Sequence, residues 1–273
     1  MKYGICSNMV VGDLRSGGIE IIETIARLGY DYIELTLHQL TALLQPDFKS
    51  ITKRIKNSGI RCECCNNFFP PSMKLTGPDA RLPVITEYVK HALGNASQLG
   101  AGIVVFGSGP AKTVPPGFPK GEAILQLIEL CRKMAPIAAD NGITIVIEHL
   151  RKEECNIINT AFEGMQLAKQ AESANIQLLI DYFHLTAEKE SPDIILAASG
   201  YIKHIHFAKT EGRSFPVNAE EEAGYEHFFG NLKKIGYNER ISLEGYSSNF
   251  EEDAKKSIAF LDQIFLKDKP SHR

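Results

Sequence analysis

Residues 142–148 of the sequence are Gly-Ile-Thr-Ile-Val-Ile-Glu, a short apolar run that follows a glycine and ends at a carboxylate. Glycine often ends a helix in a left-handed conformation, so Gly142 marks a tight turn from a helix into a strand. The apolar run is typical of a parallel strand that is buried on both faces. A charged side chain at the end of such a strand is costly to bury alone, so Glu148 needs a compensating partner.

The same turn from glycine into an apolar run recurs along the chain, with amphipathic helical segments between the runs. The other four glycines at such turns are Gly29, Gly59, Gly100 and Gly236. Strands are expected at about residues 3–7, 31–36, 60–66, 102–107, 143–148, 176–181, 202–207 and 240–245.

Eight strand–helix units in 273 residues predict an α/β fold with one closed parallel (β/α)8 barrel. We expect the barrel to span residues 1–266 and residues 267–273 to form a solvated C-terminal tail. An open doubly wound sheet would need a nucleotide-binding GxGxxG loop after the first strand, and the sequence has none there. The longest connections follow strands, which is where a barrel keeps its active site.

Composition and charge limit the classes of ligand. Hydrophobic residues make up 44% of the chain and charged residues 23%, as in a globular protein with a large core. The net charge is −3, and lysine and arginine are scattered, which argues against a nucleic-acid partner. No segment approaches the ~18 apolar residues of a membrane span. The N-terminal residues lack the apolar stretch of a signal peptide, so we expect a cytoplasmic protein that acts on a small molecule.

Four consecutive strand ends in the second half of the chain carry residues that bind metals. They are Glu148, Asp181, His206 and Glu244. Taken singly, each has an ordinary structural explanation, such as a helix N-cap or a core histidine. Because the carboxyl ends of barrel strands meet at one mouth, the four should converge. Three carboxylates and one imidazole suit one Mn²⁺, Mg²⁺ or Co²⁺ ion better than Zn²⁺.

Three nearby patterns are weaker evidence for a metal or ligand site. His204 shares a face of its strand with His206, which lies nearer the strand end and is the better ligand. The run Cys62-Glu63-Cys64-Cys65 looks like a metal cluster, but strand alternation sends Cys64 and Cys65 to opposite faces. Residues 107–109, Gly-Ser-Gly, could cradle a phosphate or form only a flexible turn.

The chain resembles the xylose isomerase-like TIM barrels and, within them, the ketose 3-epimerases of the D-tagatose and D-psicose type. The matching segments are IVIEHLRKEECNIINT (145–160), LLIDYFHL (178–185), YIKHIHFAKTEGR (201–213) and FFGNLKKIGYNERISLEGY (228–246).

The resemblance implies a role for each residue of the site. Glu148, Asp181, His206 and Glu244 would be the metal ligands, with Glu148 and Glu244 also the catalytic acid/base pair. Glu154, His184 and Arg213 would contact oxygens of the sugar. The interval from His206 to Arg213 is one residue longer than the epimerases lead us to expect.

The expected activity is that of a metal-dependent sugar epimerase or isomerase on a ketose or related keto-sugar, phosphorylated or not. The ion would polarise the carbonyl, one glutamate would remove a proton to give a metal-bound cis-enediolate, and the other would return it. The sequence leaves the oligomeric state open, and a homodimer or homotetramer is compatible with it.

Three alternatives stay open. A keto-inositol or keto-sugar dehydratase would use the same site to expel a β-hydroxyl. An apurinic endonuclease-like repair enzyme would need histidines after the second and third strands, where this chain has Glu34 and CCNNFF. A sugar-binding protein that has lost catalysis is disfavoured because both glutamates are present.

Overall fold

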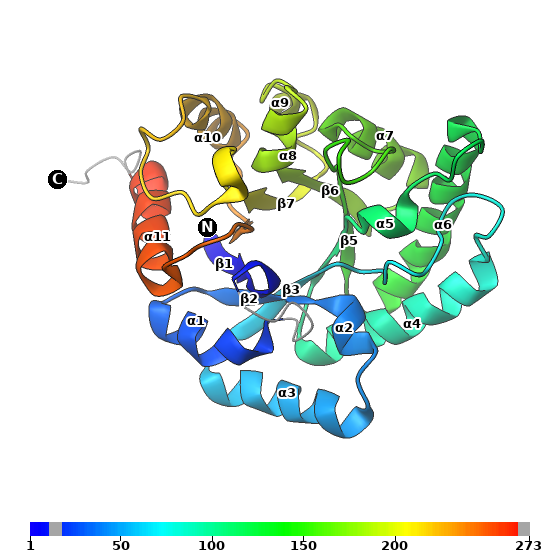
Figure 1. Ribbon diagram of the computed structural model, residues 1–273, viewed down its shortest axis with the longest axis horizontal. Coiled ribbons are helices and arrows are strands. Elements are labelled where there is room, and N and C mark those ends of the chain that lie inside the picture. Colours follow the sequence, from blue (N-terminus) through cyan, green and yellow to red (C-terminus); the bar gives the residue numbers. More distant parts are fainter. Residues whose placement is uncertain (11–17, 267–273) are drawn as a thin grey trace.

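The eight predicted strands are present and form one closed parallel barrel in chain order (Figure 1). The computed structural model describes residues 1–10 and 18–266, so the predicted tail lies outside the described residues. Each expected strand agrees with the structure to within one or two residues at its ends. The strands are Lys2–Cys6 (β1), Tyr32–Thr36 (β2), Arg61–Asn66 (β3), Ile103–Phe106 (β4), Thr144–Glu148 (β5), Ile176–Asp181 (β6), Ile202–Phe207 (β7) and Arg240–Leu243 (β8).

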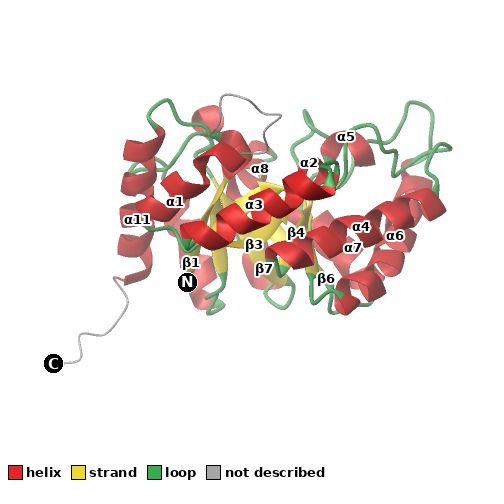
Figure 2. Ribbon diagram, turned by 90° about the horizontal axis from the view of Figure 1, so that it is seen from below, coloured by secondary structure: helices red, strands yellow, loops and turns green. Residues whose placement is uncertain are grey.

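Helices surround the barrel as an outer ring, which the side view also shows (Figures 1 and 2). The α-helices are Ile22–Leu28 (α1), Leu37–Thr41 (α2), Gln45–Ser58 (α3), Leu82–Leu99 (α4), Gly109–Lys112 (α5), Lys120–Asp140 (α6), Ala161–Ala171 (α7), Tyr182–Ala187 (α8), Ile194–Ala197 (α9), Gly224–Lys234 (α10) and Phe250–Leu266 (α11). Short 3₁₀ turns are Ser7–Met9 (η1), Ile19–Ile21 (η3) and Glu211–Arg213 (η4). No helix in the described ranges is both long and apolar enough to cross a membrane.

Left-handed glycines form the turns from helix to strand, as the sequence predicts. All five glycines named above have positive φ angles, between 67° and 90°. Only glycine adopts this conformation without steric cost, so each allows an abrupt reversal from helix into strand. These short turns lie at one end of the barrel. The opposite end is free to carry the longer loops.

The barrel interior has an apolar layer that supports the polar residues above it. This layer consists of Tyr32, Cys64, Ile103, Val105, Val146 and Leu179. A Cβ atom on Gly4 would lie 2.2 Å from the Tyr32 ring, so a glycine in β1 is needed to accommodate that ring. Cys65 packs in the outer core, between the strands and the helices. The predicted alternation of Cys64 and Cys65 is therefore confirmed, and all six cysteines are free and buried.

Candidate active site and metal centre

The four predicted metal ligands meet at the carboxyl end of the barrel. Glu148 and Asp181 are the last residues of β5 and β6, His206 is near the end of β7, and Glu244 follows β8. One possible ligand atom from each lies within 4.8 Å of the others, and all four residues are buried. His204, on the same face of β7, is not part of this group.

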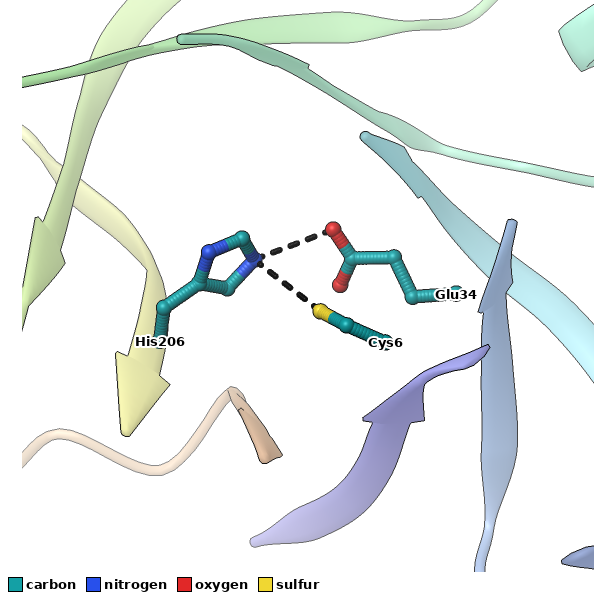
Figure 3. Close-up of side chains that lie close together, drawn as sticks. All are labelled: Cys6, Glu34 and His206. Atoms are coloured by element: carbon teal, nitrogen blue, oxygen red, sulfur yellow. Dashed lines mark hydrogen bonds and ion pairs between the residues drawn. The ribbon is translucent and has the colours of Figure 1, made fainter. Parts of the chain in front are cut away.

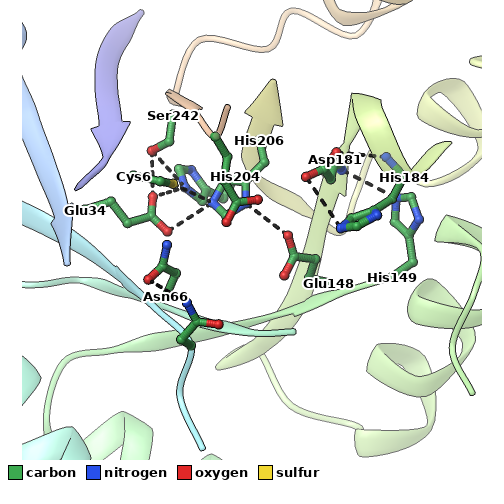
Figure 4. Close-up of polar contacts among 12 residues, drawn as sticks. Cys6, Glu34, Asn66, Glu148, His149, Asp181, His184, His204, His206 and Ser242 are labelled. Carbon is green, nitrogen blue, oxygen red and sulfur yellow. Dashed lines mark hydrogen bonds and ion pairs between the residues drawn. The ribbon is translucent and has the colours of Figure 1, made fainter. Parts of the chain in front are cut away.

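His206 points toward the Glu148 carboxylate (Figure 4) and also contacts Glu244. Its Nδ1 atom is 3.0 Å from Glu148 Oε1 and 3.0 Å from Glu244 Oε2. Burial disfavours a charge on this ring, but Cys6, Glu244 and Glu34 raise the pKa of His206 well above its usual value. The surrounding carboxylates therefore favour a positive charge at this point, which a divalent ion would also supply.

Asp181 caps a helix with one carboxylate oxygen and faces the site with the other. Its Oδ1 atom accepts a hydrogen bond from the His184 backbone N–H at 3.0 Å, which caps the N-terminus of α8. Its Oδ2 atom lies 3.5 Å from the guanidinium of Arg213. One carboxylate oxygen thus fixes the start of the helix, and the other faces the site.

The carboxyl groups have different electrostatic environments. Burial and the Glu244 charge raise the pKa of Glu148, and burial raises the pKa of Asp181 well above its usual value. Burial acts on Glu244 too, but His206 and Arg213 outweigh it and hold the pKa of Glu244 well below its usual range. Carboxyl groups whose pKa values are pushed apart can serve as one acid and one base.

Arg213 reaches the site although its loop is one residue longer than expected. Gly212 and Arg213 both have positive φ, which gives the loop a tight turn at this point. Arg213 Nη2 donates to Glu244 Oε2 at 2.6 Å, and Nη1 lies 3.5 Å from Glu154 Oε1. The guanidinium also lies over the Phe183 ring, 4.8 Å from its centroid. Arg213 and Glu154 therefore lie together beside the candidate ligands.

His184 is wholly buried and has an unpaired ring nitrogen. Its Nδ1 accepts from the backbone N–H of Arg151 at 3.3 Å, whereas its Nε2 has no hydrogen-bond partner among the described residues. Burial, with the nearby Arg213 charge, holds the pKa of His184 well below its usual value, so the ring is neutral. Its free nitrogen is available to a ligand in the adjacent cavity.

A cavity of about 300 Å³ adjoins the candidate metal site and is large enough for a small molecule. Glu148, Glu154, His184, Arg213 and Glu244 line it, so all three predicted substrate-binding residues are there. The sequence analysis named Ser108 and Gly109 only as part of the Gly-Ser-Gly pattern and did not identify the other lining residues. Those residues are Asn8, Met9, Asn67, Pro110 and Leu150.

The Gly-Ser-Gly triplet borders this cavity in a different way from a phosphate cradle. A Cβ atom on Gly107 would lie 2.0 Å from Glu148 Oε2, so the glycine makes room for that carboxylate. Ser108, at φ 42°, accepts a hydrogen bond from the Phe69 backbone N–H at 3.0 Å. The triplet therefore shapes the wall around Glu148.

A second polar cluster lies beneath the ligands, and the sequence analysis assigned it no role. Glu34 of β2, His204 of β7 and Ser242 of β8 are wholly buried inside the barrel. Cys6 and Glu34 both approach the Nε2 atom of His206 (Figure 3). Glu34 lies inside the apolar run Tyr-Ile-Glu-Leu, unlike the four ligands, which each end such a run.

The chain belongs to the xylose isomerase-like TIM barrel family, and the match to the family covers residues 22–264. Its similarity extends to named enzymes of that class. It is 27% identical over 252 residues to a D-psicose 3-epimerase of Agrobacterium fabrum, covering 90% of this chain and 85% of that protein. It is 25% identical over 253 residues to an L-ribulose 3-epimerase of Methylomonas sp., covering 91% and 85%.

A solved structure supports the same fold. The D-allulose 3-epimerase from Methylomonas sp. superimposes with a TM-score of 0.85 at 23% identity, over 97% of this chain and 98% of that one. At this level of sequence identity the match shows the fold alone.

Proposed function

We propose that the chain is a divalent-metal-dependent epimerase that inverts C3 of an unphosphorylated ketose. The chain is an isomerase-class enzyme, since curated relatives that match nine-tenths of it are named ketose 3-epimerases. The main support for C3 epimerisation is the arrangement of Glu148 and Glu244. They approach the same ring nitrogen of His206 from β5 and β8, strands separated by two others in the barrel.

The donor set fits one hard divalent cation. Three carboxyl groups and one imidazole lie within 4.8 Å of one another, and all are buried. Among the described residues, Arg213 is the one permanently charged cation that pairs with them. Buried carboxylates need such compensation, and a divalent ion would supply it. Bound there, the ion would polarise the ketose carbonyl and make the neighbouring C–H more acidic.

The two glutamates would then move the proton. Glu244, with its lowered pKa, is ionised and suited to remove a proton from C3. Glu148, whose pKa burial and the Glu244 charge raise, is suited to return a proton to the same carbon. Because the two act from different sides of the bound sugar, removal and return on opposite faces inverts the stereocentre. In the reverse reaction, the two glutamates exchange roles.

The remaining residues of the cavity favour a neutral sugar. His184 Nε2, Arg213 and Glu154 offer a donor or acceptor to sugar hydroxyls. Arg213 and Arg151 both lie against Glu154, at 3.5 Å and 2.8 Å. Neither arginine is left unpaired for a phosphate, which would need a free cation. This supports a free ketose over a sugar phosphate.

The test is solvent-isotope exchange at a defined carbon. The protein with Mn²⁺ should interconvert D-psicose and D-fructose, or L-ribulose or D-tagatose with its own C3 epimer. The product should carry one deuterium at C3 from D₂O. Deuterium at C1 with formation of an aldose would indicate aldose–ketose isomerisation instead, and loss of water would indicate the dehydratase.

Replacing either glutamate tests the acid/base assignment. Glu148→Gln and Glu244→Gln should each lower kcat about 10²–10⁴-fold, since each removes a group that transfers the proton. Glu63→Gln, a change at the opposite end of the barrel, is the matched control and should leave kcat unchanged. Deuterium incorporation that persists at the wild-type rate in Glu244→Gln would contradict the assignment.

A further inference from the structure

Directly beneath the metal ligands lies a layer of buried polar residues that the proposed reaction does not use. Glu34, His204 and Ser242 have no exposed surface, and Tyr32 lies below them. Glu34 is the centre of the layer (Figure 4). A buried carboxylate costs free energy unless it is fully hydrogen-bonded, so its contacts show what it is for.

Both oxygens of Glu34 have partners. Oε1 lies 3.0 Å from His206 Nε2. Oε2 accepts a hydrogen bond from Ser242 Oγ at 2.6 Å and lies 2.9 Å from His204 Nε2. The Tyr32 hydroxyl, 2.8 Å from Ser242 Oγ, extends the network downward. A carboxylate has only acceptors, so the ring nitrogens that face it carry hydrogen.

We propose that Glu34 is a positioning residue for the metal site, which fixes His206 with its hydrogen on Nε2 and its Nδ1 lone pair toward the three carboxylates. The inference rests on the proposed metal site and adds the residue that orients one of its ligands. Metal-binding histidines commonly donate their other ring N–H to a carboxylate, which fixes the ring and makes it a better ligand. In this role Glu34 would contact neither the sugar nor the ion.

His204 and Ser242 hold Glu34 itself in place. They come from β7 and β8, two residues before His206 and Glu244 on the same inward faces. Each of these two candidate ligands therefore has a polar residue two positions earlier in the chain, and both of those residues contact Glu34. Rigid strands make this support stiffer than a loop would.

A second ion among the buried groups is the competing explanation. Glu34, Cys64 and His204 also place ligand atoms within 4.8 Å of one another. The contacts do not favour it, because Oε2 of Glu34 already has two hydrogen-bond partners and Oε1 has one. The two explanations predict different stoichiometries, one ion per chain for a positioning role and two for a second metal site.

The direct test is the affinity of Glu34→Gln for Mn²⁺, measured by titration calorimetry on the folded full-length protein. The glutamine amide keeps the shape of the side chain but has no negative charge. Its NH₂ group would also face a hydrogen-bond donor, where Glu34 has an acceptor oxygen. The expected loss is about 10–100-fold in Mn²⁺ affinity. Glu63→Gln, another buried carboxylate near the opposite end of the barrel, is the control and should bind as wild type does.

Two further measurements keep the test decisive. If Glu34→Gln fails to fold, Ser242→Ala takes its place. It removes one hydrogen bond to Glu34 and keeps the Glu34 charge, so it should lower Mn²⁺ affinity several-fold. In the Zn²⁺-loaded protein, long-range ¹H–¹⁵N spectra of the histidine rings should show His206 protonated on Nε2, and this signature should weaken in Glu34→Gln.

The outcomes separate this inference from the proposed function. Tight binding of one ion by wild type and equally tight binding by Glu34→Gln would overturn the positioning role and leave the epimerase proposal standing. Two ions per chain would overturn it in favour of a second site. No Mn²⁺ binding by wild type at all would overturn the metal centre and, with it, both proposals.

Discussion

At the residue scale, the position of Glu148 depends on a neighbour that has no side chain. Gly107 follows β4, and its α-hydrogen side faces the Glu148 carboxylate so closely that a Cβ atom would lie 2.0 Å from Oε2. Real Cβ atoms do not approach oxygen so closely, so one of the two would have to move. Glu148 is both a proposed ligand and a proposed acid, and a small displacement affects both roles.

Gly107→Ala should therefore disable the site without unfolding the barrel. We expect kcat for the ketose to fall about 100-fold, as a displacement of roughly 1 Å can cost that much. Mn²⁺ affinity should fall as well. Gly102→Ala is the control, because a Cβ atom there meets no atom within 4 Å. Wild-type turnover and metal affinity in Gly107→Ala would contradict this account of Glu148.

The four candidate metal ligands could be predicted from the sequence, whereas the contacts of the polar residues beneath them could not. Glu148, Asp181, His206 and Glu244 each end an apolar run, and strand ends meet whatever the exact register is. The contact of Glu34 with His204 and His206 depends on register. The pairing of β2 with β3 shifts between Ile33 and Glu34, and that of β6 with β7 shifts after Leu178. Such irregularities leave no simple mark in the sequence.

At the scale of elements, strands far apart in the chain are joined at the amino end of the barrel by Glu63. Its carboxylate accepts from Lys2 Nζ of β1 at 2.6 Å and from Arg240 Nε of β8 at 2.7 Å. Burial opposes the charge, but these two cations outweigh it and lower the pKa of Glu63. The CECC run thus contributes an ion-pair network, while its thiols pack in the core.

Glu63→Gln should lower the free energy of unfolding at pH 7 by about 1–2 kcal/mol, since it weakens two charge-assisted hydrogen bonds. A carboxyl group with a lowered pKa in the folded state stabilises the fold above its unfolded pKa, and this contribution is lost as pH falls. The difference from wild type should therefore begin to shrink as pH falls below about 5, and be smaller at pH 4 than at pH 7. Denaturant unfolding at pH 7 and pH 4 measures it. An equal difference at both pH values would contradict the ion-pair assignment.

The loop that carries Arg213 shows where element-level prediction from sequence stops. The eight strands were predictable because a glycine or an apolar run marks each of them. The path of residues 208–223 was not, because one extra residue can be accommodated in several ways. Here two consecutive positive φ angles, at Gly212 and Arg213, return the guanidinium to Glu244. Backbone conformations of this kind depend on the folded surroundings.

At the scale of the whole molecule, the barrel concentrates buried negative charge at one end, and metal binding should stabilise the fold. A ligand at 100 times its Kd stabilises the folded state by about 2.7 kcal/mol. For a chain of this size, that corresponds to a rise in Tm of about 5–10 °C. Differential scanning calorimetry with Mn²⁺ and with EDTA measures the effect. Asp181→Asn should reduce the rise, and an identical Tm in Mn²⁺ and EDTA would contradict the metal site.

The central claim is that one divalent ion binds between Glu148, Asp181, His206 and Glu244. Anomalous diffraction from crystals grown with Mn²⁺ tests it most directly. We predict one strong peak at about 2 Å from a carboxylate oxygen of each acidic residue and from Nδ1 of His206. A peak among Glu34, Cys64 and His204, or no peak within the barrel mouth while Mn²⁺ is bound in solution, would contradict the account.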